Sequence, residues 1–168
     1  MEVPANISVS IRSFRPSDAA ACKALYLDGL IAGKIAENDT GFDIEDIQSA
    51  YMKHPGNHMW VAETPDGLVV GMVGVQQHDA GVGEIRRLRV AVDYRRRGIG
   101  QALIETAVAF CREKQYLKIM LDTFMDQAAA VQMFEKFRFQ HERTRTVGDK
   151  QLMYFYFDLY GGGPQAPG

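Results

Sequence analysis

The stretch R-R-R-G-I-G-Q, residues 95–101, separates a strand pattern from a long apolar helix pattern. Residues 84–92 are predicted to form a strand, and apolar residues recur at helical spacing along residues 99–114. The first turn of a helix has backbone N–H groups without helical acceptors, and Gly98 and Gly100 let an anion approach closely. Six arginines and one aspartate lie within residues 86–97, in a chain of net charge -2. The stretch predicts an anion site, with a solvated charged loop as the alternative.

The length and composition of the chain indicate how many domains it has and which partners it is expected to lack. Its 168 residues, 46% of them hydrophobic, suit one domain, expected at residues 7–160, followed by a disordered tail at residues 161–168. The net charge gives no general attraction to nucleic acid, so no nucleic-acid partner is expected. Cys22 and Cys111 have no metal or redox spacing, so we expect two reduced, buried thiols and no metal. Without an apolar run of about 18 residues or a signal-like N-terminus, we expect no membrane partner and a cytoplasmic location.

The order of predicted elements indicates an α/β fold. The turn T-P-D-G at residues 64–67 is expected to join two strands into a hairpin. The order β-α-α-β-β-β-α-β-α-β-β predicts one sheet flanked by helices. Strands are expected at residues 7–14, 59–62, 68–75, 84–92, 117–121, from 139 and at 152–159, and helices at about 17–31, 43–52, 99–114 and 127–137.

Two nucleotide-binding motifs do not fit residues 95–101. A dinucleotide fingerprint needs a third glycine where Leu103 stands, and a P-loop needs a Gly-Lys-Ser/Thr ending, which is absent. Instead, residues 84–102, E-I-R-R-L-R-V-A-V-D-Y-R-R-R-G-I-G-Q-A, resemble the acyl-CoA-binding core of the GNAT superfamily of N-acetyltransferases. Arg95, Gly98 and Gly100 match its Arg/Gln-x-x-Gly-x-Gly/Ala motif.

The resemblance extends to most of the chain. Residues 130–139, A-V-Q-M-F-E-K-F-R-F, are similar to the family's later helix, A-x-x-L-Y-E-K-x-G-F, and the element order agrees over residues 7–159. Phrases such as M-W-V-A-E and Y-R-R-R-G-I-G resemble the Camello-like group. The resemblance implies the GNAT fold, a mixed, mostly antiparallel sheet of about seven strands flanked by about four helices.

The resemblance also implies a site for acetyl-CoA as co-substrate. In the family, two neighbouring strands splay apart and the pantetheine arm pairs with the fourth strand, a role that falls to the backbone of Val90, Ala91 and Val92. Gln127 stands where the family commonly has asparagine. The motif arginine and the pyrophosphate contacts fall to Arg95, Arg96, Arg97, Gly98, Ile99, Gly100 and Gln101.

The implied chemistry is direct attack of an amine on the thioester. Amines are mostly protonated at neutral pH, so a base must take the proton. Glu84 matches the family's fourth-strand glutamate, with a surface glutamate as the alternative. Phe134 occupies the position of the tyrosine that many members of the family use as a general acid for the leaving thiolate, and phenylalanine cannot donate a proton. Tyr154 or Tyr156 could replace it, or both could be packing residues of the sheet.

The acceptor is expected to be a primary amine of a small molecule, such as an amino acid or an amino-acid conjugate. Arg86, Arg87 and Arg89 could hold its carboxylate, or could be salt-bridged structural residues. Strand alternation places Arg86 on one face and the other two on the opposite face, unless a bulge intervenes. The alternative functions are a protein or peptide N-terminal acetyltransferase and an acetyl-CoA sensor without turnover. The run Y-F-Y-F at residues 154–157 is compatible with a homodimer.

Overall fold

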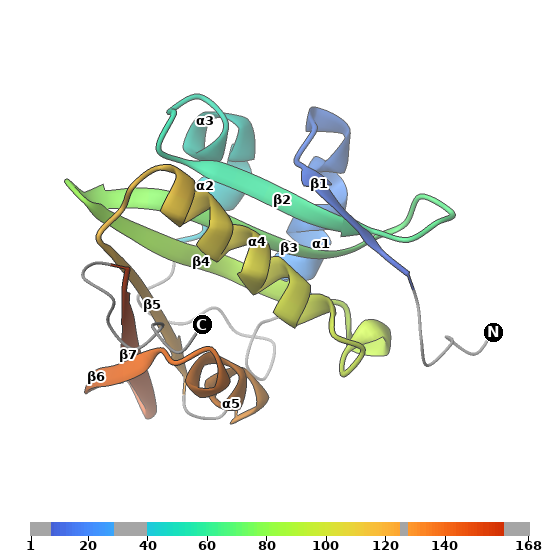
Figure 1. Cartoon of the computed structure of the whole chain (residues 1–168). Coiled ribbons are helices and arrows are strands. Elements are labelled where there is room, and N and C mark those ends of the chain that lie inside the picture. The colour runs from blue at the N-terminus through green and yellow to red at the C-terminus, as the bar shows by residue number, and fades with distance from the viewer. Residues whose placement is uncertain (1–7, 29–39, 125–127, 160–168) are drawn as a thin grey trace.

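The computed structural model describes residues 8–28, 40–124 and 128–159. One seven-stranded sheet runs through them in the order β1-β2-β3-β4-β5-β7-β6. This arrangement confirms the predicted mixed sheet flanked by helices (Figure 1). Its strands are β1 (Ser10–Ser13), β2 (His58–Glu63), β3 (Val69–Asp79), β4 (Val82–Val90), β5 (Lys118–Phe124), β6 (Gln140–Val147) and β7 (Lys150–Asp158). Its α-helices are α1 (Ala19–Asp28), α2 (Phe42–Glu45), α3 (Ile47–Tyr51), α4 (Ile99–Glu113) and α5 (Ala128–Lys136).

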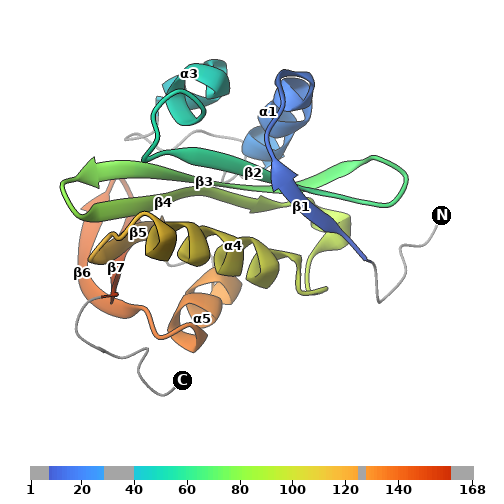
Figure 2. The same ribbon diagram turned by 45° about the horizontal axis from the view of Figure 1, so that its top comes forward.

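Helices cover both faces of the sheet and give it two cores. Figure 2 shows α1 and α3 on one side and α4 and α5 on the other. On the α4 side, Leu103, Ile104 and Cys111 are fully buried against the sheet. On the α1 side, Cys22 and Tyr51 are fully buried in the second core. The two cysteines are therefore buried thiols, as expected, and burial raises the pKa of each to about 12.

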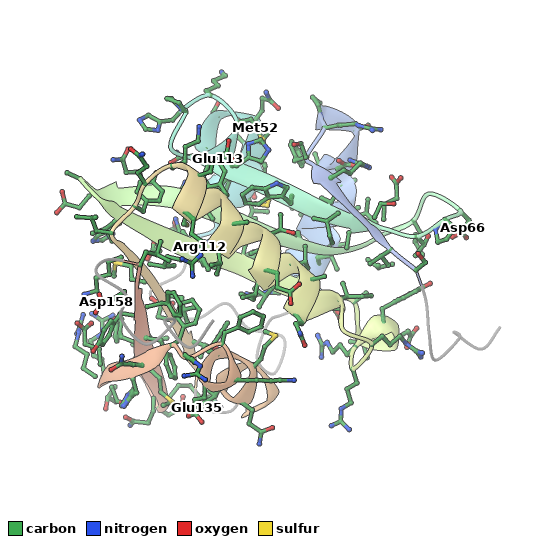
Figure 3. The ribbon with its side chains drawn as sticks, in the orientation of Figure 1. Met52, Asp66, Arg112, Glu113, Glu135 and Asp158 are labelled. Carbon is green, nitrogen blue, oxygen red and sulfur yellow. The ribbon has the colours of Figure 1, made fainter. Side chains whose placement is uncertain are left out.

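The α4 helix also reaches the strands at the far end of the sheet. Arg112 lies near its C-terminal end (Figure 3), and the guanidinium carbon is 5.8 Å from the centroid of the Phe157 ring in β7. Among the described helices, none is long and apolar enough to span a bilayer.

The direction of strand pairing in the sheet changes between β4 and β5. These two strands are parallel and pair through Val82–Lys118, Gly83–Ile119 and Glu84–Met120, whereas the other neighbouring strands are antiparallel. Beyond the last pair β4 continues to Val90 and β5 to Phe124, and Figure 1 shows the two strands diverging. Beyond Glu84, the edge of β4 that faces β5 therefore has no ladder partner among the described residues, and this splayed part of the sheet is called the opening between β4 and β5.

A bulge in β4 changes the predicted directions of its arginines. Arg86 pairs with Gly74 and Arg89 with Met72, so three steps along β4 face two along β3. Arg87 takes φ of 58° within this bulge. Arg86 and Arg87 consequently both contact residues on the α1–α3 side, and Arg89 pairs with Met72 of the core there. Simple alternation, which separates Arg86 from Arg87 and Arg89, is wrong here.

The helix predicted at residues 43–52 is two short helices. Asp46, between α2 and α3, has φ of −147°, and its Oδ1 accepts a hydrogen bond from Ser49 N at 3.1 Å. The aspartate ends one helix and caps the next, which a periodicity argument cannot detect. Leu30 and Ile31, predicted at the end of the first helix, and the expected tail lie outside the described residues.

Candidate active site

The first turn of α4 forms the part of the site that the motif predicted. Gly98, the residue before the helix, has φ of 81°, and its carbonyl accepts the hydrogen bond from Ala102 N. The amides of Ile99, Gly100 and Gln101 therefore precede the first helical hydrogen bond and have no acceptor within the helix. A Cβ placed on Gly98 would meet no atom of the described residues within 4 Å. Open space, outward amides and the helix dipole suit a phosphate group.

The two motif glycines differ in how strictly they are required. The left-handed φ of Gly98 disfavours any side chain by about 1–2 kcal/mol. A Cβ on Gly100 would lie 3.5 Å from Met133 Sδ and 3.8 Å from Val90 Cγ2, which is ordinary contact. Gly100 thus has room for a methyl group, in keeping with the Gly/Ala choice of the motif.

The arginines before α4 are used unequally. Arg95 donates from Nε to the Val90 carbonyl at 2.9 Å, and its NH2 lies 4.0 Å from Asp28 Oδ2 at the end of α1. Arg95 thus closes the loop between β4 and α4 in this structure, and its predicted contact with the cofactor stays a prediction. Arg96 is exposed and has φ of 62°, and Arg97 is half-buried. The predicted cofactor residue Gln127 lies outside the described residues.

Glu84 lies where β4 and β5 separate. Its backbone pairs with Gln76 on one side and with Met120 on the other. Burial raises the pKa of Glu84, the neighbouring Arg86 opposes that shift, and Asp122 adds to it. Its side chain is still 23% exposed, so a proton can reach it. A carboxylate with a raised pKa at the edge of an opening fits the predicted role of general base.

Arg86 lies beside this carboxylate and is held by a neutral amide. Its NH1 donates to Gln76 Oε1 at 2.6 Å, while its Nε is 3.7 Å from Glu84 Oε1. The Gln76 amide in turn donates from Nε2 to the Ala50 carbonyl of α3 at 3.1 Å. Arg86 is therefore fixed near Glu84 with a third of its side chain exposed.

Arg87 has a different role from Arg86. It donates from Nε and NH2 to the two carboxylate oxygens of Asp43 at 2.9 and 2.7 Å, and both side chains are 8% exposed. Asp43 also accepts from the Tyr51 hydroxyl at 2.5 Å, and the Arg87 guanidinium lies over the Tyr26 ring. Burial alone would raise the pKa of Asp43, but the hydrogen bonds from Arg87 and Tyr51 outweigh it and lower the pKa to about 2. Arg87, predicted to bind substrate, here joins β4 to α2.

Arg89 is half-buried and donates from NH1 to the Leu88 carbonyl at 3.0 Å. It shares the α1–α3 face with Arg86, as the pairing with Met72 requires. Of the three predicted arginines, Arg86 has its Nε 3.7 Å from Glu84 Oε1.

Both candidate tyrosines contact residues of β6. Tyr156 pairs with Met120, in the same row across the sheet as Glu84, but its hydroxyl donates to Gln140 of β6 at 3.0 Å. Tyr154 pairs with Asp122, and the Arg143 guanidinium lies 3.9 Å from its ring centroid. A proton-donor role for either tyrosine stays a prediction.

Phe134 is a packing residue. Its side chain is 4% exposed, and its ring centroid lies 6.0 Å from those of Phe139 and Phe155. Its burial matches the lack of a hydroxyl, because a buried hydroxyl there would need a hydrogen-bond partner.

Sequence reasoning missed Gln76, Asp122 and the pairing role of Asp43. The predicted third strand ended at Val75, one residue short of Gln76, although β3 continues to Asp79. The alternation of that strand, extended by one residue, would have placed Gln76 on the same face of the sheet as Met72. No local signal marks Asp43 as a partner of Arg87, because 44 positions separate them.

Proteins of known sequence that resemble this chain are named as N-acetyltransferases. A probable N-acetyltransferase camello from Xenopus tropicalis is 37% identical over 119 residues, which cover 70% of this chain and 54% of that protein. N-acetyltransferase 8 from Homo sapiens is 34% identical, covering 58% of this chain and 45% of that protein. The human N-acetylaspartate synthetase is 36% identical, covering 59% and 33% respectively. The chain thus spans about a third to a half of these relatives' lengths.

Solved structures share the fold. An acetyltransferase of the GNAT family from Staphylococcus aureus Mu50 aligns with a TM-score of 0.79 and 19% identity, over 90% of this chain and 99% of that one. The protein yncA from Salmonella typhimurium, solved with its cofactor acetyl-CoA, aligns with a TM-score of 0.78 and 16% identity, over 92% and 95%. The model of the "Acetyltransferase (GNAT) family" matches residues 23–139, well over half of the sequence, so this chain belongs to the GNAT family of acetyltransferases.

Proposed function

We propose that the protein is an acetyl-CoA-dependent N-acetyltransferase whose acceptor is the primary amine of an amino acid or amino-acid conjugate. The observation that carries this proposal is the opening between β4 and β5, which has Glu84 at its closed end. The β4 backbone runs along it towards the first turn of α4. A cofactor-like chain can pair with the strand there while its phosphates meet the helix amides.

Each residue of the site has a part in this reaction. When bound, acetyl-CoA supplies the acetyl group as a thioester. The amides of residues 98–101 hold its diphosphate, and the backbone of residues 90–92 aligns its pantetheine arm. Glu84 accepts the proton of the incoming ammonium, directly or through water, so that the neutral amine is present at the point of attack.

The side chains near Glu84 support an acceptor that carries a carboxylate. Arg86 is one third exposed and next to the base, and arginine can hold a carboxylate through two parallel hydrogen bonds. One relative is named N-acetylaspartate synthetase, which names an amino acid as the acetylated molecule in that protein. We therefore place the carboxylate of the acceptor on Arg86 and its amine towards Glu84.

The proposal can be tested by following release of the coenzyme A thiol with a panel of amines. The panel contains amino acids, their carboxamides, amino-acid conjugates, polyamines, aminoglycosides and short peptides. We expect turnover with amino acids or their conjugates, and at least about tenfold lower kcat/KM for the matching carboxamide, since a charged hydrogen bond is lost. Arg86→Gln should remove this difference between acid and amide. Equal rates for acid and amide in the unaltered protein would rule out carboxylate recognition.

Phe134 favours a second candidate, an acetyl-CoA-binding module without turnover. The residue lacks the hydroxyl that the family resemblance assigns to the departing thiolate. Calorimetry separates the two candidates: binding of acetyl-CoA with no thiol release across the panel supports the module. Absence of acetyl-CoA binding contradicts both.

A further inference from the structure

Gln76 connects the helical layer to the charged side chains of β4. Its Nε2 donates to the Ala50 carbonyl at 3.1 Å, which fixes the direction of the amide. Its Oε1 then accepts from Arg86 NH1 at 2.6 Å. The guanidinium is thus attached through a neutral group to the backbone of α3, on the same face of the sheet as Glu84.

The resulting separation between Arg86 and Glu84 is longer than a hydrogen bond. Nε and Oε1 are 3.7 Å apart, whereas charge-assisted hydrogen bonds measure about 2.7–2.9 Å. Both side chains are partly exposed, at 33% and 23%, so packing alone does not hold them apart. In this structure the two groups form an ion pair without a hydrogen bond. An arginine two residues from a carboxylate on the same strand face can close the remaining distance, and the bond to Gln76 opposes that closure.

We propose that Gln76 is a positioning residue that keeps the Arg86 guanidinium from closing on Glu84, so that the carboxylate stays able to accept a proton and the guanidinium stays able to bind the acceptor. This inference rests on the roles of Glu84 and Arg86 in the proposed function. It adds a specific device to them: the neutral Gln76 amide holds the Arg86 guanidinium at 3.7 Å from the Glu84 carboxylate.

The charges around Glu84 agree with this reading. Burial raises its pKa and Asp122 of β5 adds to the rise, while Arg86, His78 of β3 and Arg87 act in the opposite direction. The raised pKa persists with Arg86 at its observed distance. A hydrogen bond from Arg86 would lower it further, because hydrogen bonding to the charged form of a carboxyl group favours that form. Glu84 would then be a weaker base.

Two substitutions of Gln76 should shift the titration of Glu84 in opposite directions. Gln76→Leu removes the acceptor for Arg86, so the arginine closes on Glu84 and the titration midpoint falls by about one pH unit. Gln76→Glu keeps an acceptor for Arg86 and adds a negative charge, so the midpoint rises by about one pH unit. The midpoint is read from the carbon-13 NMR signal of the Glu84 carboxyl, which is assigned by its loss in Glu84→Gln.

Gln77→Leu is the matched control, because Gln77 is the exposed neighbour on the same strand. Its midpoint should equal that of the unaltered protein, and thermal unfolding verifies that all variants are folded. A purely structural role for Gln76 predicts no fall of the midpoint in Gln76→Leu, whereas the added charge of Gln76→Glu raises the midpoint in either case. An unchanged or raised midpoint in folded Gln76→Leu overturns the inference.

Kinetics separate this inference from the proposed function. The acidic limb of kcat/KM should move with the NMR midpoint, and KM for a carboxylate acceptor should rise about tenfold in Gln76→Leu. An acidic limb that survives in Glu84→Gln contradicts the base assignment but leaves the NMR result to decide the role of Gln76. A limb that is lost in Glu84→Gln but unmoved in both Gln76 variants contradicts the positioning role alone.

Discussion

The proposed cofactor side and the proposed acceptor side of the site are built in different ways. The proposed cofactor side consists of main-chain groups from one continuous segment, residues 90–101, and its shape depends on the backbone conformation of Gly98. The proposed acceptor side consists of side chains from separate elements: Glu84 and Arg86 of β4, with Arg86 bound by Gln76 of β3. A site of the first kind tolerates changes of side chain but not of backbone, and a site of the second kind should show the reverse.

Gly98→Glu should have the largest effect and fall on the cofactor side alone. The left-handed φ and a carboxylate beside the diphosphate together should weaken acetyl-CoA binding by about 1,000-fold. Calorimetry measures the loss, and circular dichroism verifies folding. Gly100→Ala is the matched control and should bind within about threefold of the unaltered protein, since its methyl group makes only ordinary contacts. Equal losses in both variants would contradict the distinction between the two glycines.

Glu84→Gln should affect the acceptor side alone. We expect kcat to fall about 100-fold, because the base is gone, while the affinity for acetyl-CoA is unchanged. The acidic limb of the pH–rate profile should also disappear, since Glu84 acts only when deprotonated and burial raises its pKa. Rates measured by thiol release across the pH range test both points. An unaltered kcat at every pH would remove Glu84 from the mechanism.

Asp43→Asn should cost stability rather than chemistry. It leaves the Arg87 charge buried without its carboxylate, which we expect to lower the free energy of unfolding by about 2 kcal/mol at pH 7. The pKa of Asp43 is lowered to about 2 in the folded state. Its stabilisation is therefore present above pH of about 4, the unfolded value, and is lost as the pH falls through about 2.

Urea unfolding of both proteins between pH 7 and pH 2 tests this dependence. The difference between them should shrink in the acidic range. Glu45→Gln serves as control, because the Lys23–Glu45 pair is exposed, at 53% and 65%, and should change stability little. A difference that stays constant down to pH 2 would show that the charge of Asp43 is not what stabilises α2.

Phe134→Tyr should have the smallest effect. Restoring the family's tyrosine places a hydroxyl in a pocket of aromatic rings, so we expect a loss of about 1 kcal/mol in stability and no gain in kcat. Thermal unfolding and thiol release measure the two quantities. An increase in kcat would mean that the position faces the departing thiolate after all.

The same contrast explains what could be predicted from the sequence. The R-x-x-G-x-G segment and the helix after it are local in the chain, and both Gly98 and the start of α4 lie where the pattern placed them. The element order is equally local and led to the observed sheet. Contacts between distant elements determine the other features: the bulge at Arg87, the break at Asp46 and the hydrogen bonds of Gln76 to Ala50 and Arg86. Periodicity cannot detect such contacts, because nothing in the neighbouring residues changes when they form.

The three residue pairs that join β4 to β5 have a mechanical consequence. The sheet has two halves, one of β1 to β4 and one of β5, β7 and β6. The halves are joined by these three pairs and by α4, whose Arg112 contacts Phe157 of β7. A ligand that pairs with β4 inside the opening extends this short connection and joins the two halves of the sheet more firmly. By mass action, occupancy at 100 times the dissociation constant adds about 2.7 kcal/mol to folding stability. The two halves of the sheet should therefore unfold more cooperatively with the ligand bound than without it.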